Sequence, residues 1–181
     1  VSLGFDEPDN EDGKRPSLYK SLGRNSNFRT LSHGDYSQKV PGWKQMAYWE
    51  PYETFINLCG QSSDEEFSRD FEKLVALDNI IDFHLMLWFN NDQDGSRANI
   101  FIARDNKPGS RFFLIPWDND KTFKKTGWQK NHLLKRLMKI YPGYNERLKR
   151  RYHELRRGLL ADEALMKRID RIVERLQPAY R

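Results

Sequence analysis

Cysteine, long apolar runs and closely spaced glycines are scarce or missing in this chain of 181 residues. Cys59 has no second cysteine to pair with, so an intrachain disulfide is excluded. No apolar run approaches the roughly 20 residues that a membrane-spanning helix needs. None of the 11 glycines stands two positions from another, so no G-x-G-x-x-G phosphate loop is present. The chain starts with neither an initiator Met nor a signal-peptide pattern, and we expect it to be part of a longer protein.

What is present fits one folded domain. Hydrophobic residues make up 38% of the chain and aromatic residues 13%, which argues against disorder. The length is sufficient for a real hydrophobic core. Lys and Arg number 31 against 26 Asp and Glu, giving a net charge of +5. This mild excess permits an acidic partner but does not demand nucleic acid, and no nucleic-acid function is expected.

Residues 1–45 are rich in Asp, Glu, Gly, Pro, Ser and Asn and predict a loop-rich segment. A short extended piece is expected at Leu18-Tyr19-Lys20, where Lys20 reads as a surface lysine of a strand. Aromatic side chains then crowd together between Trp43 and Phe55. Packing in the core is the commoner role for such a group, and a ligand groove is the alternative.

Two helices are expected next. Ser63 and Glu66 form a capping box ahead of apolar residues that repeat at helical spacing up to Val75. The following segment, for which Asp78 is a candidate cap, is apolar nearly all round and predicts a buried helix. His84 lies inside it, and a core histidine is the better interpretation than a metal ligand or catalytic group.

A β-hairpin is predicted over residues 99–115, with strands at 99–104 and 111–115 joined by a turn rich in Asn, Pro and Gly. Two amphipathic helices should follow, the second capped by Asp162. The Arg-rich segment 147–157 favours a solvated helix face over a phosphate or nucleic-acid site. The fold class is therefore α+β, mainly helical, with a loop-rich segment at 1–45 and the main body at 46–181.

Acidic clusters flank the first and second strands of this hairpin. Asn99 follows Asp94 by five residues, and Asp118 and Asp120 come directly after the second strand. Protein kinases use the same Asp-to-Asn spacing in the loop H-R-D-x-x-x-x-N, where the Asp orients the attacking hydroxyl and the Asn holds a metal. Antiparallel pairing brings Asn99 and Asp118 to one end of the hairpin. Carboxylate and amide oxygens are ligands of Mg²⁺, so a phosphoryl-transfer site is one interpretation.

Two other interpretations compete with it. Asn, Asp and Gly around Asp94 are also typical of a plain turn that ends a helix, and spacing alone leaves this alternative open. A calcium loop would place its position twelve at Phe101, where the EF-hand pattern requires Glu. That mismatch argues against calcium.

The motifs Asn91-x-x-Asp94-Gly95-x-x-x-Asn99 and Pro116-Trp117-Asp118-x-Asp120-x-Thr122-Phe123 resemble those of the CotH family. The resemblance extends over most of the chain, and its members are atypical, kinase-like proteins that phosphorylate Ser residues of proteins. It implies a kinase-like C-lobe that uses ATP and Mg²⁺ or Mn²⁺. By this resemblance Asp94 is catalytic, Asn99 and Asp118 hold metal, and Asp120 is the second acidic position of the motif.

Some family features differ or are missing. Asp92 stands where the family usually has Asn, and Lys124 where Gly is common. No strand carrying a nucleotide-pairing lysine is visible, so the nucleotide-clamping half of such a kinase would precede Val1, and the residues that bind the nucleotide are not identified. An isolated fragment could then be inactive.

The resemblance implies an acceptor Ser, or Thr, on a protein partner, and a spore-coat, cell-surface or secreted location. A non-catalytic surface or spore-coat binding module with a kinase-like fold is the main alternative. A metal-dependent hydrolase that uses the same carboxylates is another.

Overall fold

The computed structural model describes residues 15–23, 26–42, 44, 46–91, 94–123 and 130–180. The chain divides into two compact units, the first ending at Pro142 and the second starting at Gly143. The predicted boundary near residue 45 is a different division of the chain and stays a prediction. All four candidate site residues belong to the first unit.

A four-stranded antiparallel sheet in the first unit has the strand order β2-β1-β3-β4. The strands are β1 (Ser17–Ser21), β2 (Tyr36–Val40), β3 (Ile100–Arg104) and β4 (Phe113–Pro116). β1 contains the extended piece that the sequence predicts, whereas β2 lies in a segment expected to be loops. β3 and β4 form the expected hairpin, with Ile100 opposite Pro116. Sheet and helices together make the α+β fold that the sequence predicts.

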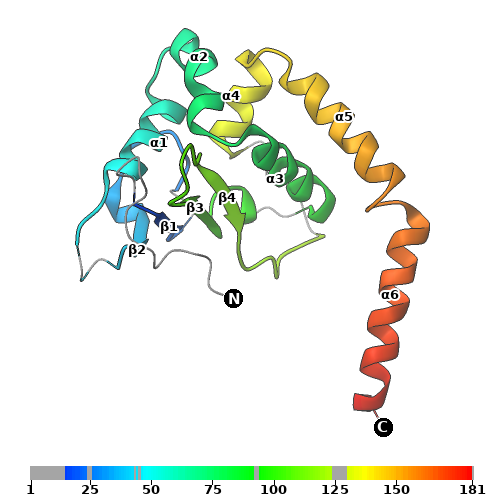
Figure 1. The fold of residues 1–181 in the computed structure, drawn as a ribbon. Coiled ribbons are helices and arrows are strands. Elements are labelled where there is room, and N and C mark those ends of the chain that lie inside the picture. Colours follow the sequence, from blue (N-terminus) through cyan, green and yellow to red (C-terminus); the bar gives the residue numbers. More distant parts are fainter. Residues whose placement is uncertain are drawn as a thin grey trace. The chain divides into compact units, whose positions relative to one another are not determined.

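Helices in the first unit pack beside this sheet (Figure 1). They are α1 (Glu50–Gly60), α2 (Asp64–Leu74), α3 (Leu77–Asn90) and α4 (His132–Ile140), with short 3-10 turns η1 (His33–Asp35) and η2 (Asp94–Ser96). The ring of Tyr52 in α1 lies 5.6 Å from that of Tyr19 and 4.7 Å from that of Tyr36, between ring centres. Tyr52 and Phe55 are fully buried, so these aromatic residues pack in the core, as expected. Trp43 lies outside the described residues.

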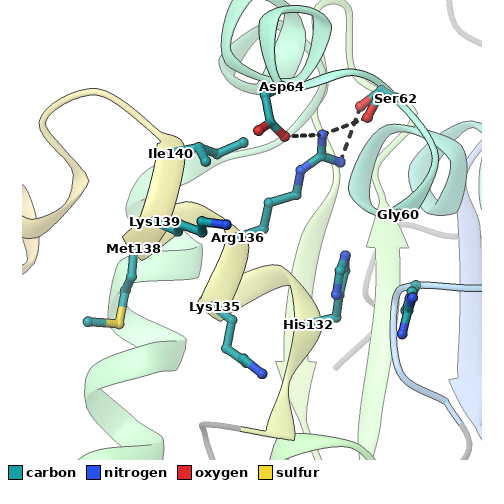
Figure 2. A pocket seen from close by; sticks show the side chains of 10 residues that line it. Gly60, Ser62, Asp64, His132, Lys135, Arg136, Met138, Lys139 and Ile140 are labelled. Atoms are coloured by element: carbon teal, nitrogen blue, oxygen red, sulfur yellow. Dashed lines mark hydrogen bonds and ion pairs between the residues drawn. The ribbon is translucent and has the colours of Figure 1, made fainter.

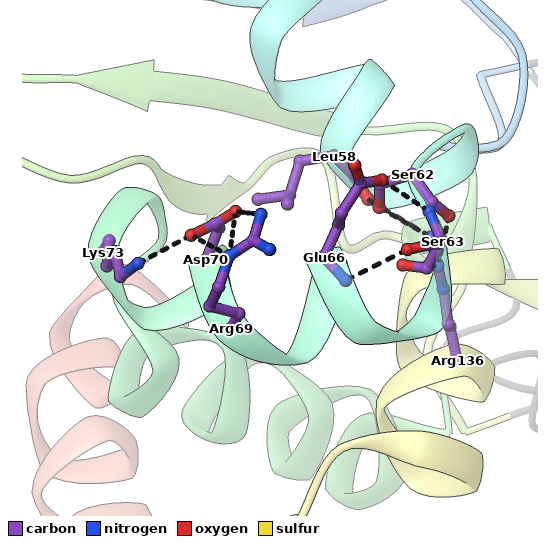
Figure 3. Close-up of polar contacts among 8 residues, drawn as sticks. All are labelled: Leu58, Ser62, Ser63, Glu66, Arg69, Asp70, Lys73 and Arg136. Atoms are coloured by element: carbon purple, nitrogen blue, oxygen red, sulfur yellow. Dashed lines mark hydrogen bonds and ion pairs between the residues drawn. The ribbon is translucent and has the colours of Figure 1, made fainter.

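α2 begins at the capping box that the sequence predicts (Figure 3). The Ser63 hydroxyl accepts the backbone N–H of Glu66 at 3.1 Å, and the Glu66 carboxylate accepts the backbone N–H of Ser63 at 2.9 Å. These bonds satisfy two N–H groups that a helix start otherwise leaves without partners. The buried Phe67 and Phe71 then anchor the helix on the core.

α3 is buried along much of its length and is hydrogen-bonded to β4, an edge strand of the sheet. It begins at Leu77 with Ala76 at the N-cap, so the prediction that Asp78 caps it is wrong. Asp78 lies in the first turn instead, where a carboxylate favours the helix dipole. The side-chain amide of Asn79 donates to the carbonyl of Leu114 at 3.1 Å and accepts its N–H at 2.8 Å. Asn79 therefore bonds to the edge of β4 as a neighbouring strand would.

His84 in α3 is fully buried, as expected for a core histidine. Its ring centre lies 5.0 Å from that of Trp88 in an edge-to-face arrangement. Burial lowers the pKa of His84 to about 4, because the charged imidazolium loses its hydration. The side chain is therefore neutral near pH 7.

The second unit consists of α5 (Tyr144–Arg157), α6 (Asp162–Leu176) and a short 3-10 turn, η4 (Gln177–Tyr180). Asp162 is the first residue of α6 rather than its cap, which is Ala161. An ion pair of 3.0 Å joins Arg156 to Asp162 across the turn between the helices. Ile169 and Leu176 of the expected apolar stripe stay about half exposed. No described helix has both the length and the apolar character needed to cross a membrane.

Candidate active site

Asp94 stands in a tight turn between the end of α3 and the start of β3. Its carbonyl oxygen accepts the N–H of Arg97 at 3.1 Å and that of Ala98 at 2.9 Å. The turn is held from outside, because the Asn131 amide donates to the carbonyl of Ser96 at 2.8 Å. Asn131 also caps α4 through its side-chain oxygen. A plain turn is thus present, and it delivers the chain directly to Asn99.

Asn99 and Asp118 meet at the end of the hairpin, as antiparallel pairing predicts. The N–H of Trp117 donates to the carbonyl of Asn99 at 2.8 Å, which extends the β3–β4 ladder by one step. The side-chain amide of Asn99 donates to the backbone carbonyl of Asp118 at 3.0 Å. This bond fixes the orientation of the Asn99 amide and leaves its Oδ1 atom on the other side. The side chain of Asp118 is exposed beside it.

Asp94 is tied to the segment that follows β4. The ammonium of Lys121 lies 2.9 Å from its Oδ2 atom, and the Asp94 side chain is only 15% exposed. Asp120, next to Lys121 in the chain, is exposed, and its side chain makes no hydrogen bond or ion pair with the described residues. The structure therefore joins Asn99 to Asp118 and Asp94 to Lys121, while Asp120 stands apart from these contacts.

Unusual backbone conformations gather at this site. Asn91, Asn99, Asp118 and Phe123 all have φ between 52° and 59°, and Phe28 is the one other described non-glycine residue with a positive φ. Asn and Asp tolerate this left-handed region better than most residues, but Phe does not. The N–H of Phe123 is bonded to the carbonyl of Asn90, the last residue of α3, at 2.6 Å. Strained residues cluster at functional sites more than elsewhere, which supports a functional role here.

An aromatic and basic group lies beside the acidic one. Trp117 is 49% exposed and meets Phe101 edge to face, with ring centres 6.0 Å apart. The Lys20 ammonium lies 4.9 Å from the centre of the Trp117 ring, within cation–π range. Lys20 therefore packs against this rim of the sheet rather than extending freely from the surface.

The donor groups fit Mg²⁺ better than a metal that needs several protein ligands. No three His, Cys, Asp or Glu side chains within the described ranges form a group that could hold a metal ion. Mg²⁺ commonly takes only one or two carboxylates and completes its shell with water and substrate phosphates. The Asn99 amide oxygen and the Asp118 carboxylate are hard oxygen donors that meet this need.

A comparison against known protein families identifies the family of this chain. The model of the family described as CotH kinase protein matches residues 7–181, nearly the whole chain. The chain belongs to the CotH kinase family. No curated protein matches it. Asp92 and Lys124, where the chain departs from the usual CotH pattern, both lie outside the described residues.

Sequence reasoning overlooked several residues of this site. Lys121 is one of them, because its contact with Asp94 joins residues 27 positions apart and leaves no local signal in the sequence. Asn119 was given no role from the sequence. The structure shows that its Oδ1 atom is buried and makes no hydrogen bond to the described residues. Asn131 could have been predicted as the N-cap of α4, because Asn directly before an apolar helical repeat is a favourable cap.

Proposed function

We propose that this CotH kinase family chain is the catalytic C-lobe of an atypical protein kinase, which transfers the γ-phosphoryl group of ATP to Ser, or Thr, of a protein. One observation carries the proposal: Asn99 is bonded to the backbone of Asp118 at the same end of the hairpin that Asp94 approaches through its turn. These are the residue types that kinases use for metal binding and for orienting the acceptor hydroxyl. A plain turn does not need all three.

Each residue has a distinct role in this proposal. Asp94 accepts a hydrogen bond from the acceptor hydroxyl and orients it toward the phosphoryl group. Asn99 and Asp118 are the residues that would hold Mg²⁺, and Asp120 would assist as a further oxygen donor. When bound, the metal neutralises the charge on the transferred phosphoryl group. Lys121 holds the Asp94 carboxylate at 2.9 Å and limits its rotation.

Calorimetry separates this proposal from a non-catalytic binding module. The full-length protein that contains this chain is titrated with ATP, with and without Mg²⁺ or Mn²⁺. We expect metal-dependent binding that Asp118→Ala weakens by about tenfold or more, because this substitution removes a proposed metal ligand. Asp170→Ala on the exposed face of α6 is the matched control and should leave binding unchanged.

Equal nucleotide binding with and without metal would contradict the proposal and favour the binding module. Phosphate release from small substrates, with no label on protein, would instead favour the hydrolase interpretation.

A further inference from the structure

A cavity in the first unit is lined by residues of α4 and by the end of α1. Its volume is about 740 Å³, and five of its ten lining residues are Arg, Lys or His. Figure 2 shows His132, Lys135, Arg136 and Lys139 along α4. Their spacing places them on one face of the helix. The candidate active-site residues do not line this cavity.

Arg136 belongs to the framework of the cavity. Its guanidinium donates to the carbonyls of Leu58 at 3.2 Å and Cys59 at 3.1 Å, and to that of Ser62 at 2.6 Å. It also pairs with Asp64 at 3.1 Å, the one acidic side chain in the lining (Figure 2). The charge of Arg136 is therefore largely compensated within the protein.

The remaining cations of the cavity are not compensated in this way. Arg29, Lys135 and Lys139 are exposed, and none of them forms an ion pair with a residue that the structure describes. Burial and the nearby charges of Arg136, Arg29 and Lys135 lower the pKa of His132. Three cationic side chains and an imidazole thus face one space that holds a single, already paired carboxylate.

The backbone of Arg29 is fixed at this wall by close packing. A Cβ atom on Gly60 would lie 2.2 Å from the carbonyl oxygen of Arg29, so only glycine permits this approach. The side chain of Gln61 donates to the same oxygen at 2.7 Å, and the Asn27 side chain accepts the N–H of Arg29 at 2.8 Å. The positive φ of Phe28, 57°, completes a turn that presents Arg29 to the cavity.

We propose that this cavity binds the phosphate group of a phosphoserine residue in a peptide. A phosphate monoester has three acceptor oxygens and close to two negative charges, which matches several separate cations better than a single carboxylate does. The cavity is much larger than a phosphate ion, and Met138 and Ile140 add apolar wall for neighbouring peptide residues. The choice of phosphoserine rests on the proposed function, which would produce it, and a product held here would keep the substrate on the protein.

The test is a binding experiment without ATP or metal, so its result does not depend on catalysis. Short peptides identical except for Ser, phosphoserine or Glu at one position are titrated into the protein, and inorganic phosphate is titrated separately. We expect the phosphoserine peptide to bind about tenfold tighter than each of the others. Lys135→Gln combined with Lys139→Gln should abolish this preference, whereas Lys149→Gln on α5 should retain it. Binding should also raise the pKa of His132, followed by NMR.

Several outcomes would overturn the proposal. Equal affinity for the Ser and phosphoserine peptides would exclude phosphate recognition. Equal affinity for the Glu peptide would show that the cavity binds any acidic side chain. Equal affinity for inorganic phosphate would show that the peptide contributes nothing to binding. A preference that survives in the double variant, with unchanged thermal unfolding, would place the binding elsewhere.

Discussion

Replacing Arg136 by Met should cost the protein about 3 kcal/mol of unfolding free energy. The Arg136 side chain is only 10% exposed. The carbonyls of Cys59 and Ser62 have no other donor among the described residues, and losing the donor of a part-buried acceptor costs about 1–1.5 kcal/mol each. The guanidinium also lies 4.3 Å from the ring centre of Phe67, a contact that contributes about 1 kcal/mol when partly buried. Methionine retains most of the aliphatic stem, so little packing is lost.

The bond of Arg136 to Asp64 adds little to this figure, because the Asp64 side chain is 65% exposed and water screens the pair. Arg69→Met is the matched control, since the Arg69 guanidinium pairs with Asp70 at the surface and its side chain is 62% exposed (Figure 3). Its loss should change the unfolding free energy much less than the loss of Arg136, because water screens this surface pair. Urea unfolding followed by tryptophan fluorescence measures both variants. Equal destabilisation by Arg136→Met and Arg69→Met would refute this account of the Arg136 network.

Three further predictions concern stability. Burial lowers the pKa of His84 to about 4, so the unfolded chain takes up a proton first as the pH falls. Stability should be fully present above about pH 6.5 and fall by up to about 3 kcal/mol on acidification to pH 4, and His84→Gln should weaken this dependence in urea titrations. Ser63→Ala removes the capping acceptor of α2 and should cost about 1 kcal/mol, measured by thermal unfolding. Gly60→Ala places a Cβ against the Arg29 backbone and should cost about 1–3 kcal/mol. Gly23→Ala, where nothing lies within 4 Å, should be near neutral, and equal effects would contradict the packing argument.

The hairpin and the start of α2 could be predicted because their signals are local. The turn between the two apolar runs brings Asn99 opposite the segment that holds Asp118, whatever the rest of the fold does. The capping box of α2 likewise depends on Ser63 and Glu66 alone. The start of α3 was misassigned by two residues, since a carboxylate at Asp78 suits the first turn as well as the cap.

What could not be predicted depends on contacts between distant segments. β2 is only five residues long and lies among residues with loop-forming composition, so its pairing with β1 decides its structure. The contact of Lys121 with Asp94 requires the path of the chain after β4. The basic cavity requires Arg29 to meet α4, about 100 residues later, through the space that Gly60 leaves open.

The most direct test of the proposed kinase activity is transfer of the labelled γ-phosphoryl group from ATP to protein. The full-length protein is compared as wild type, as Asp94→Asn and as Asp170→Asn, with Mg²⁺ present. Asp94→Asn keeps the size of the side chain but removes the carboxylate that we propose orients the acceptor hydroxyl, so we predict a rate lower by about 10²–10⁴-fold. Asp170→Asn should transfer at the wild-type rate. Undiminished transfer by Asp94→Asn would contradict the assignment of this site.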